Sequence, residues 1–339
     1  MSTSTPGPLH RIAPAAGLFL LAPLVAEFLL GNLPITMLAA LLALAPLYGG
    51  GALLIRELTR RAGRGVPTML VLGIAYGLAE EGITTQSLFN PDYAGAHLLA
   101  DGFIPALGIA GPWTLFVLSL HAIWSTTASI VVAEALVPGR RTTPWLRAPG
   151  LVVTAVLFVL GIAATTYVDL AVYPFSPRPA QMAAVVAIVA LLVALAFRLP
   201  RAGDGAPGTA PHPAVVAVIG LVAGAVFFLA GNAVSGWAYV AIVLVMDAGL
   251  ALAVRRWAAR AAWTPLHTLA LAGAALLTYA WHSFPESPLT AVAPAVDTFG
   301  NAVFTVGAVV VLVLAVARTR HDRWAHESAH SHSIRTTAG

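Results

Sequence analysis

The sequence contains neither cysteine nor lysine, and only 9% of its 339 residues are charged. Without cysteine the chain has no disulfide, no thiolate nucleophile and no cysteine ligand for a metal. About 25% of the residues are charged in an average soluble domain, so the low charge excludes that class of protein. All 18 basic residues are arginine and alanine is abundant, a pattern typical of GC-rich bacterial genomes.

The sequence consists largely of long apolar segments. Hydrophobic residues make up 59% of the chain, and the mean hydropathy is +0.85. The runs repeatedly reach the roughly 20 residues that a helix needs to cross the hydrocarbon core of a bilayer. They predict an all-α, polytopic transmembrane helix bundle of about ten spans. The spans are expected at 12–33, 35–55, 66–90, 113–137, 149–173, 181–196, 213–233, 236–254, 264–282 and 298–317.

The arginines indicate how the spans are oriented. If the N-terminus is cytoplasmic, 17 of the 18 arginines fall on the cytoplasmic side and only Arg178 falls outside. This is the distribution that the positive-inside rule describes, and it requires an even number of spans. We therefore expect both termini in the cytoplasm and a multi-pass protein of the bacterial cell membrane. The first apolar run is too long for a cleaved signal peptide and predicts an uncleaved anchor.

Residues 1–317 are expected to form a single transmembrane domain, followed by a cytoplasmic tail at 318–339. The tail contains four histidines at irregular spacing, His321, His326, His330 and His332. Its composition predicts a disordered segment rather than a metal site. The net charge of +4 reflects arginines that face anionic lipid headgroups, so the expected partner is the lipid bilayer and not a nucleic acid.

Two adjacent carboxylates, Glu80 and Glu81, stand inside the third apolar run. Glu80 lies ten residues before Asn90, about 15 Å below the expected outer end of that span. On the next span His121 lies eight residues after Trp113, about 12 Å below the outer end. The two glutamates and the histidine are therefore expected at one depth on consecutive antiparallel helices.

The faces of these two spans agree with their depths. Gly73 and Gly77 form a small-xxx-small pair that lets a neighbouring helix approach closely. The same stripe continues through the polar residues Glu81, Thr84 and Thr85. On the facing span His121 and Ser125 share one stripe. We expect the two polar faces to meet.

The energetics indicate a site rather than an accident of sequence. An acidic residue at the bilayer centre costs about 2.5–3.5 kcal/mol on insertion scales, so two need compensation. Adjacent carboxylates cannot both ionise cheaply in a low dielectric, and a neighbouring His121 favours the ionised form of one of them. Because successive helical residues point about 100° apart, the stripe favours Glu81 as the partner of His121. If His121 lies between the two glutamates, Glu80 faces the outside.

The stretches "AEEGITTQSLF" (79–89) and "FVLSLHAIW" (116–124) resemble the first two motifs, EExxxR and FxxxH, of the CAAX-protease and bacteriocin-processing family of intramembrane glutamic endopeptidases. The resemblance implies a metal-independent endopeptidase without cofactor. Glu80 would then be the catalytic base, Glu81 its support and His121 the histidine of the second motif. Thr85 and Val117 stand where that family has Arg and Phe, and its third motif, HxxxN or HxxxD, is absent. The rest of the chain resembles uncharacterised multi-pass membrane proteins of actinobacteria.

Other polar residues lie within or near the predicted spans. Those toward the outside are expected to outline a funnel that leads to the central trio, and they are Glu27, Asp169, His282, Asp297 and Asn301. Glu134 and Asp247 lie on the inner half, near arginines. They either snorkel toward those arginines or continue a path across the membrane.

Three classes of function remain open at this stage. An intramembrane hydrolase predicts a water-activating site at Glu80, Glu81 and His121 that acts on a peptide or lipid. A proton-coupled transporter of small molecules predicts a path that continues to Asp247 or Glu134. A structural or partner-binding subunit predicts that the trio only hydrogen-bonds two helices together.

Overall fold

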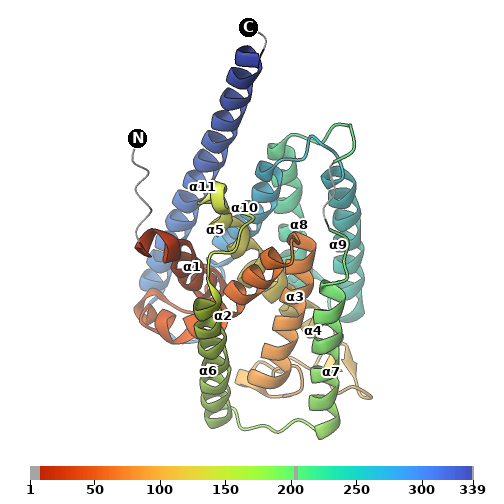
Figure 1. Cartoon of the computed structure of the whole chain (residues 1–339). Coiled ribbons are helices and arrows are strands. Elements are labelled where there is room, and N and C mark those ends of the chain that lie inside the picture. The colour runs from red at the N-terminus through yellow and green to blue at the C-terminus, as the bar shows by residue number, and fades with distance from the viewer. Residues whose placement is uncertain (1–7, 202–204, 338–339) are drawn as a thin grey trace.

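The computed structural model describes residues 8–201 and 205–337, and most of them lie in helices (Figure 1). The α-helices are α1 (Pro8–Pro23), α2 (Ala40–Arg61), α3 (Val66–Ala79), α4 (Gly111–Ser119), α5 (Ser129–Ala135), α6 (Ala148–Val172), α7 (Pro179–Ala196), α8 (Pro213–Ala233), α9 (Gly236–Ala258), α10 (Pro265–His282) and α11 (Pro294–Thr337). π-Helical segments widen the spans at η1 (Leu24–Leu29), η3 (Glu80–Thr84) and η5 (Leu120–Ala128). The shorter elements are the 3-10 turns η2 (Ile35–Met37), η4 (Tyr93–Gly95) and η6 (Pro138–Arg140) and the antiparallel strands β1 (Phe103–Ile104) and β2 (Ile109–Ala110).

The predicted transmembrane architecture is confirmed. Nine helical stretches among the described residues are long and apolar enough to cross a membrane. They coincide with nine of the ten predicted spans. The tenth, predicted at 264–282, is α10, an 18-residue helix that is less apolar than the others. α10 tolerates its polar side chains because it lies inside the bundle, packed against α8, α11 and η5.

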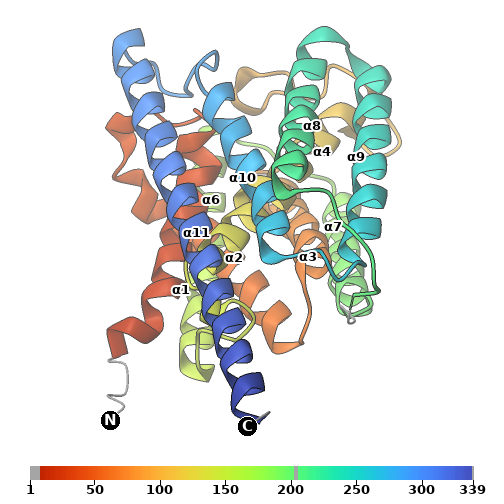
Figure 2. The same ribbon diagram turned by 90° about the horizontal axis from the view of Figure 1, so that it is seen from above.

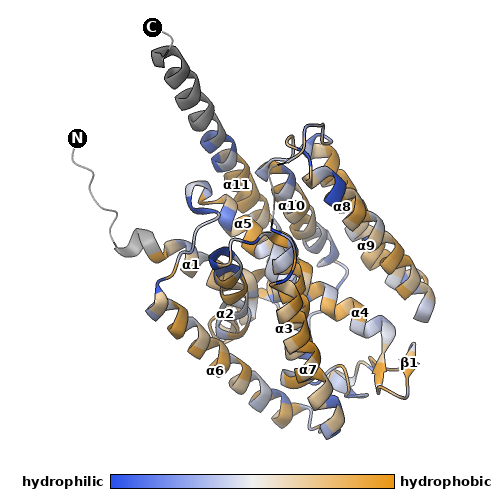
Figure 3. Cartoon of the chain, turned by 45° about the vertical axis from the view of Figure 1, so that its right-hand side comes forward, coloured by the Kyte–Doolittle hydropathy of each residue, from blue (hydrophilic) through white to orange (hydrophobic). Residues whose placement is uncertain are grey.

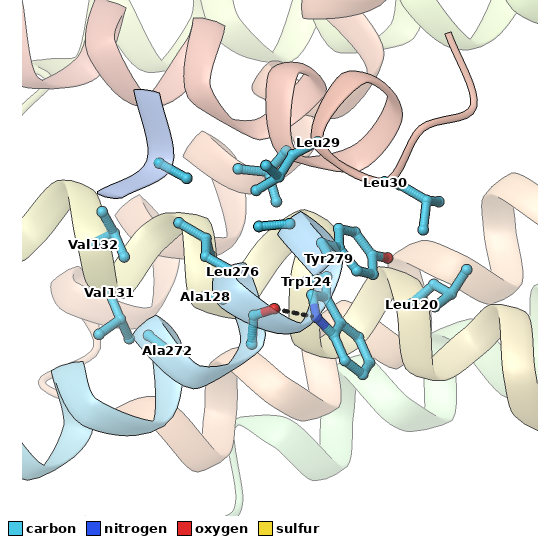
Figure 4. Packing of buried hydrophobic residues seen from close by; sticks show 14 of the residues in the cluster. Leu29, Leu30, Leu120, Trp124, Ala128, Val131, Val132, Ala272, Leu276 and Tyr279 are labelled. Atoms are coloured by element: carbon cyan, nitrogen blue, oxygen red, sulfur yellow. Dashed lines mark hydrogen bonds between the residues drawn. The ribbon is translucent and has the colours of Figure 1, made fainter. Parts of the chain in front are cut away.

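The core around α10 combines aromatic and aliphatic side chains (Figure 4). The ring of Trp124 on η5 stacks on Tyr279 of α10, with 5.1 Å between the centroids and 3° between the planes. Its indole nitrogen donates a hydrogen bond of 2.8 Å to the carbonyl of Ala275. Leu29 and Leu276 are fully buried in the same cluster. This packing supplies the van der Waals contact that holds helices together in lipid.

The outer helices present apolar side chains to the surroundings. Figure 3 shows apolar residues along most of α6 and α9. Side chains such as Val159, Leu191 and Val245 are more than half exposed. Exposed apolar side chains along whole helices are typical of a face that contacts lipid.

The two ends of the described chain lie on the same side of the bundle. Figures 1 and 2 show the first turns of α1 and the last turns of α11 at one end. This agrees with an even number of crossings, while the cytoplasmic location of that end stays a prediction. A disordered tail was expected from 318 onward, whereas the backbone of α11 continues as helix to Thr337. Residues 338 and 339 lie outside the described ranges.

The third span ends earlier than predicted. It was expected to reach Asn90, but the helical segment η3 ends at Thr84. Gln86 then adopts a positive φ of 61°, which turns the chain out of the helix. Residues 86–90 are buried all the same. They fold back as a turn beside the helix end, and this turn contributes to the site described below.

Candidate functional site

Four buried or partly buried ionisable residues lie on the π-helical segments. Glu27 lies on η1, Glu80 and Glu81 on η3, and His121 on η5. A π-helical turn inserts an extra residue into an α-helix and changes the direction in which side chains point. Such turns occur frequently at functional sites. Because these four residues all lie on π-helical segments, this part of the bundle is the candidate functional site.

His121 lies between the two glutamates. Its Nε2 is 2.8 Å from Oε1 of Glu81 and forms a hydrogen bond. Its Nδ1 is 3.3 Å from Oε2 of Glu80. The residues His121, Glu81 and Glu80 are 4%, 7% and 3% exposed. The predicted meeting of the trio is therefore confirmed, with the imidazole held from both sides.

Two glycines on α3 let η5 approach closely enough for this contact. A Cβ atom at Gly77 would stand 2.8 Å from Cβ of His121. A Cβ atom at Gly73 would stand 2.8 Å from Cα of Ala122. Both distances are shorter than normal carbon–carbon contacts, so only glycine fits at either position. The stripe of small residues read from the sequence is thus the contact surface between the two spans.

Glu81 is surrounded by hydrogen-bond donors. The Thr85 hydroxyl donates to Oε2 of Glu81 over 2.9 Å, and the Ser87 hydroxyl donates to the same oxygen. The indole of Trp113 donates to Ser87 over 3.2 Å. Ser87 reaches Glu81 because the chain folds back after η3. Several donors around one carboxylate stabilise its ionised form.

Glu80 has a different environment. Its Oε2 and Nδ1 of His121 both lack a well-aligned hydrogen bond within the described ranges, although they face each other. Tyr76, one turn earlier on α3, packs its ring edge against His121, with 5.6 Å between centroids. Tyr48 of α2 stacks on the other face of the imidazole, with 6.2 Å between centroids. Glu80 is thus enclosed by the rings and hydroxyl groups of two tyrosines, while Glu81 is held by the hydroxyl groups of Thr85 and Ser87.

Glu27 joins the site through Tyr48. The Tyr48 hydroxyl donates a hydrogen bond of 2.5 Å to Oε1 of Glu27. The Asn32 side chain donates to Oε2 over 3.3 Å. Of the predicted funnel residues Glu27 is therefore the one linked to the trio by a described contact.

The other predicted polar residues make no described side-chain contact with the trio. Ser125 donates to the carbonyl of Leu120 in its own span, and Thr84 is buried beside the trio's segment without a hydrogen-bond partner among the described residues. The remaining contacts are His282 with Glu286 at 3.1 Å, Asn301 with the Ser283 carbonyl at 3.0 Å, and Asp169 with the Tyr93 hydroxyl at 3.0 Å. Asp247 lies on α9, partly exposed. The structure does not bring these residues to the trio, and the continuous funnel stays a prediction.

Glu134 belongs to a separate network at the opposite end of the bundle. It accepts from Nε of Arg56 over 3.1 Å and from Nε of Arg60 over 2.8 Å. Arg56 also pairs with Glu57 at 2.5 Å and lies over the ring of Trp145, 3.5 Å from its centroid. The sequence favoured snorkelling of Glu134 toward nearby arginines. The partners are indeed arginines, but they come from α2; Arg56 is fully buried, and the Arg60 side chain is 11% exposed.

Sequence reasoning missed four side chains of the site, Tyr48, Tyr76, Ser87 and Trp113. Tyr76 lies four residues before Glu80, a spacing that places it on the same helical face. That signal was available in the sequence. Tyr48 comes from a span that no pattern pairs with the trio, and Ser87 depends on the turn after η3.

The trio has the donor atoms of a metal-binding group. Glu80, Glu81 and His121 each offer one ligand atom, and these atoms lie within 4.8 Å of one another. A cavity of about 450 Å³ elsewhere is lined by Leu136 and Val137, which follow α5, by η6 including Arg140, and by α11 including Arg318, and not by the trio. Glu80, Glu81 and His121 are themselves at most 7% exposed.

Comparison with known proteins gives a family but no activity. A family model described as an uncharacterized membrane protein family matches residues 18–332. No match supports the CAAX-protease family, which the two motifs resemble. No curated protein and no solved structure matches the chain significantly.

Proposed function

Because the chain belongs to this uncharacterized membrane protein family, whose description gives no activity, we propose a function from the site itself: a membrane-embedded hydrolase. In this proposal the reacting water lies at Glu80 and His121, and Glu81 positions the imidazole. The observation that carries it is the unequal environment of two carboxylates that hold one histidine. Unequal surroundings separate the proton affinities of paired groups, and such pairs serve as acid and base in many enzymes.

Glu81 has the surroundings of a positioning residue. Its carboxylate contacts Nε2 of His121 at 2.8 Å and accepts from Thr85 and Ser87. A carboxylate held in this way fixes the tautomer and orientation of the imidazole. Glu80 has the surroundings of the reacting group, because its Oε2 faces Nδ1 of His121 without a settled hydrogen bond among the described residues.

The inner acids give less support to transport across the whole membrane. Glu134 is occupied by Arg56 and Arg60. Asp247 lies on α9, partly exposed, and no described contact joins it to the trio. A path for protons from the trio to the inner side would need at least one of these carboxylates. The polar groups around the trio instead favour a site that opens to one side.

The segment that carries the glutamates lies close to the lipid-facing helices. η3 packs against both α6 and α7, which stand on either side of α3 in Figure 1. Val185 of α7 contacts the backbone at Gly82, and Phe158 of α6 packs on Tyr76 with 6.0 Å between centroids. A substrate in the bilayer would therefore reach the site if α6 or α7 moved aside, because only this one layer of helices separates η3 from lipid.

The test uses purified protein in lipid nanodiscs and a library of single-span peptides with varied flanking sequences. Mass spectrometry of the products should show cleavage of a subset by the wild type. Glu80→Gln and His121→Gln should each slow it by about 10²–10⁴-fold, the usual contribution of acid–base groups. Asp247→Asn, which removes a partly exposed carboxylate away from the site, should cleave as the wild type does. Equal cleavage by Glu80→Gln would overturn the proposal.

Proton-coupled transport is the second candidate, and the contact between Tyr48 and Glu27 favours it. That hydrogen bond extends the proton-carrying groups beyond the trio toward η1. Proteoliposomes with an internal pH-sensitive dye would report proton flux. Flux that depends on both Glu27 and Glu80, without peptide cleavage, would favour the transporter over the hydrolase.

A further inference from the structure

The contact between Glu80 and His121 has the geometry of two ligands around a metal ion. We propose that Oε2 of Glu80 and Nδ1 of His121 bind one divalent transition-metal ion, with Glu81 holding the imidazole from the opposite side. The ion would be a cofactor of the site described above. Binding of the ion does not depend on the proposed function, but its role in hydrolysis does. This inference departs from the metal-independent enzyme that the family resemblance implied.

The tautomer of His121 supports this assignment. Glu81 accepts hydrogen bonds from Thr85 and Ser87, so it is placed to act as an acceptor toward the imidazole as well. The proton of a neutral imidazole then lies on Nε2, which is 2.8 Å from Glu81. Nδ1 is left with its lone pair directed toward Oε2 of Glu80, 3.3 Å away. Two buried acceptors that face each other need a positive charge between them.

The distance and alignment fit an ion better than a proton. A charge-assisted N–H···O hydrogen bond has its heavy atoms about 2.7–2.9 Å apart and nearly in line. Glu80 and His121 are 3.3 Å apart, and neither atom has a well-aligned partner in the described part of the chain. A tetrahedral ion about 2.1 Å from a nitrogen and an oxygen ligand separates those two atoms by roughly 3.4 Å. With an ion on the lone pair of Nδ1 of His121, Oε2 of Glu80 lies to one side of that lone pair, so the two atoms are poorly aligned for a direct hydrogen bond.

Glu81 completes a known arrangement around metal-bound histidines. A metal-ligating imidazole usually donates its other nitrogen to a carboxylate, which fixes the ring and raises its basicity. Glu81, His121 and Glu80 form this series of carboxylate, imidazole and second ligand. One imidazole nitrogen with carboxylate oxygens suits Zn²⁺, Mn²⁺ or Fe²⁺. In the proposed hydrolase such an ion would supply Lewis-acid activation of water.

Charge balance in the buried site favours the same conclusion. Both carboxylates are at least nine-tenths buried, and a single imidazolium could neutralise only one of two ionised carboxylates. Arg56 and Arg60 are engaged with Glu134 and Glu57. An uncompensated carboxylate in the interior is costly, and a divalent ion would neutralise the pair.

The test measures metal content and affinity of the full chain. Protein purified without a polyhistidine tag is stripped with a chelator and passed through a desalting column. It is then titrated with Zn²⁺ and with Mn²⁺, and the bound metal is counted by mass spectrometry. We expect about one ion per wild-type chain and, because second-shell carboxylates tune metal affinity by about 10–100-fold, a loss of that size in Glu81→Gln. Glu80→Gln and His121→Gln should lose the site altogether.

Two controls separate this site from other histidines. His282→Gln removes the second buried histidine that contacts a glutamate, Glu286, and should leave the stoichiometry unchanged. Replacement of His326, His330 and His332 by Ala removes tail histidines that could bind metal on their own, and should also leave one ion. Size-exclusion profiles and thermal unfolding of each variant establish that a lost ion is not a lost fold.

The outcomes distinguish this inference from the proposed function. Less than about a tenth of an ion in the wild type, or equal affinity in a folded Glu80→Gln variant, overturns the metal site. Peptide cleavage that persists in a chelator-stripped, metal-free enzyme overturns the Lewis-acid role of the ion, while it leaves the hydrolase intact. One ion lost in Glu80→Gln and kept in His282→Gln establishes the metal site, even if no peptide is cleaved.

Discussion

Arg56 and Glu134 form a buried ion pair between α2 and α5, with Nε and Oε1 3.1 Å apart. Arg56 is fully inaccessible and Glu134 nearly so. The guanidinium of Arg56 also donates to the carbonyls of Arg140, Arg141 and Thr143. One side chain thus holds two spans and the segment that connects α5 to α6.

The first prediction concerns this pair. Glu134→Gln should lower the free energy of unfolding by about 3–5 kcal/mol, because it leaves Arg56 buried with less compensating charge. Thermal unfolding in detergent would show the loss as a lower melting temperature. Asp247→Asn is the matched control and should unfold close to the wild type, since Asp247 is partly exposed on α9. An unchanged melting temperature for Glu134→Gln would mean that the pair is solvated.

The second prediction concerns the helix contact at the trio. Gly77→Ala places a Cβ 2.8 Å from Cβ of His121, so the helices must move apart. Overpacking of this kind costs about 1–3 kcal/mol. Gly249→Ala adds the same atom to α9, where nothing lies within 4 Å, and should be neutral or slightly stabilising. Similar melting temperatures for the two variants would contradict the close approach.

The third prediction separates the two glutamates. Glu81→Gln should lower the free energy of unfolding by about 1–3 kcal/mol, because an amide cannot accept all the hydrogen bonds that Glu81 receives from its buried donors. Glu80→Gln should leave unfolding nearly unchanged, since the amide has the same size and removes one of two adjacent carboxylates. Thermal unfolding of both variants, side by side, measures the difference. A Glu80→Gln variant that is the less stable of the two would reverse these roles.

The fourth prediction is topological and uses the absence of cysteine. Thr142→Cys and Ser287→Cys place single thiols in exposed segments at opposite ends of the bundle. In intact cells a membrane-impermeant maleimide should label position 287 and not position 142. Labelling of both after the membrane is permeabilised shows that each thiol is reactive. Labelling at 142 in intact cells would reverse the orientation that the arginines predict.

The sequence was sufficient to predict the trio because each step depended on local periodicity. Counting residues from the ends of two consecutive spans put Glu81 and His121 at one depth. The spacing of Gly73 and Gly77 then identified the face on which the spans meet. The fold class followed from the length of the apolar runs, which requires no knowledge of how the helices pack.

Features that depend on packing between distant segments could not be predicted in this way. Tyr48 stacks on His121 although α2 and η5 are far apart in sequence, and nothing in the pattern of α2 indicates that neighbour. The third helix ends where Gln86 adopts a positive φ. Glutamine gives no sequence signal for that conformation, so the end of the helix could not be predicted. Glu134 selects Arg56 and Arg60 over nearer arginines because helix packing, and not sequence distance, determines its partners.

The network around Arg56 also has a consequence for the order in which the chain assembles. Its contacts join Arg56, Glu57, Arg60, Arg61 and Glu134 to the segment that ends at Leu146. All of these residues are synthesised before α6 begins. At about 5–20 residues per second, the ribosome needs about 10–40 s more to make the rest of the chain. During that interval the first spans can neutralise their own buried arginines, so the later helices would insert beside a preassembled N-terminal unit.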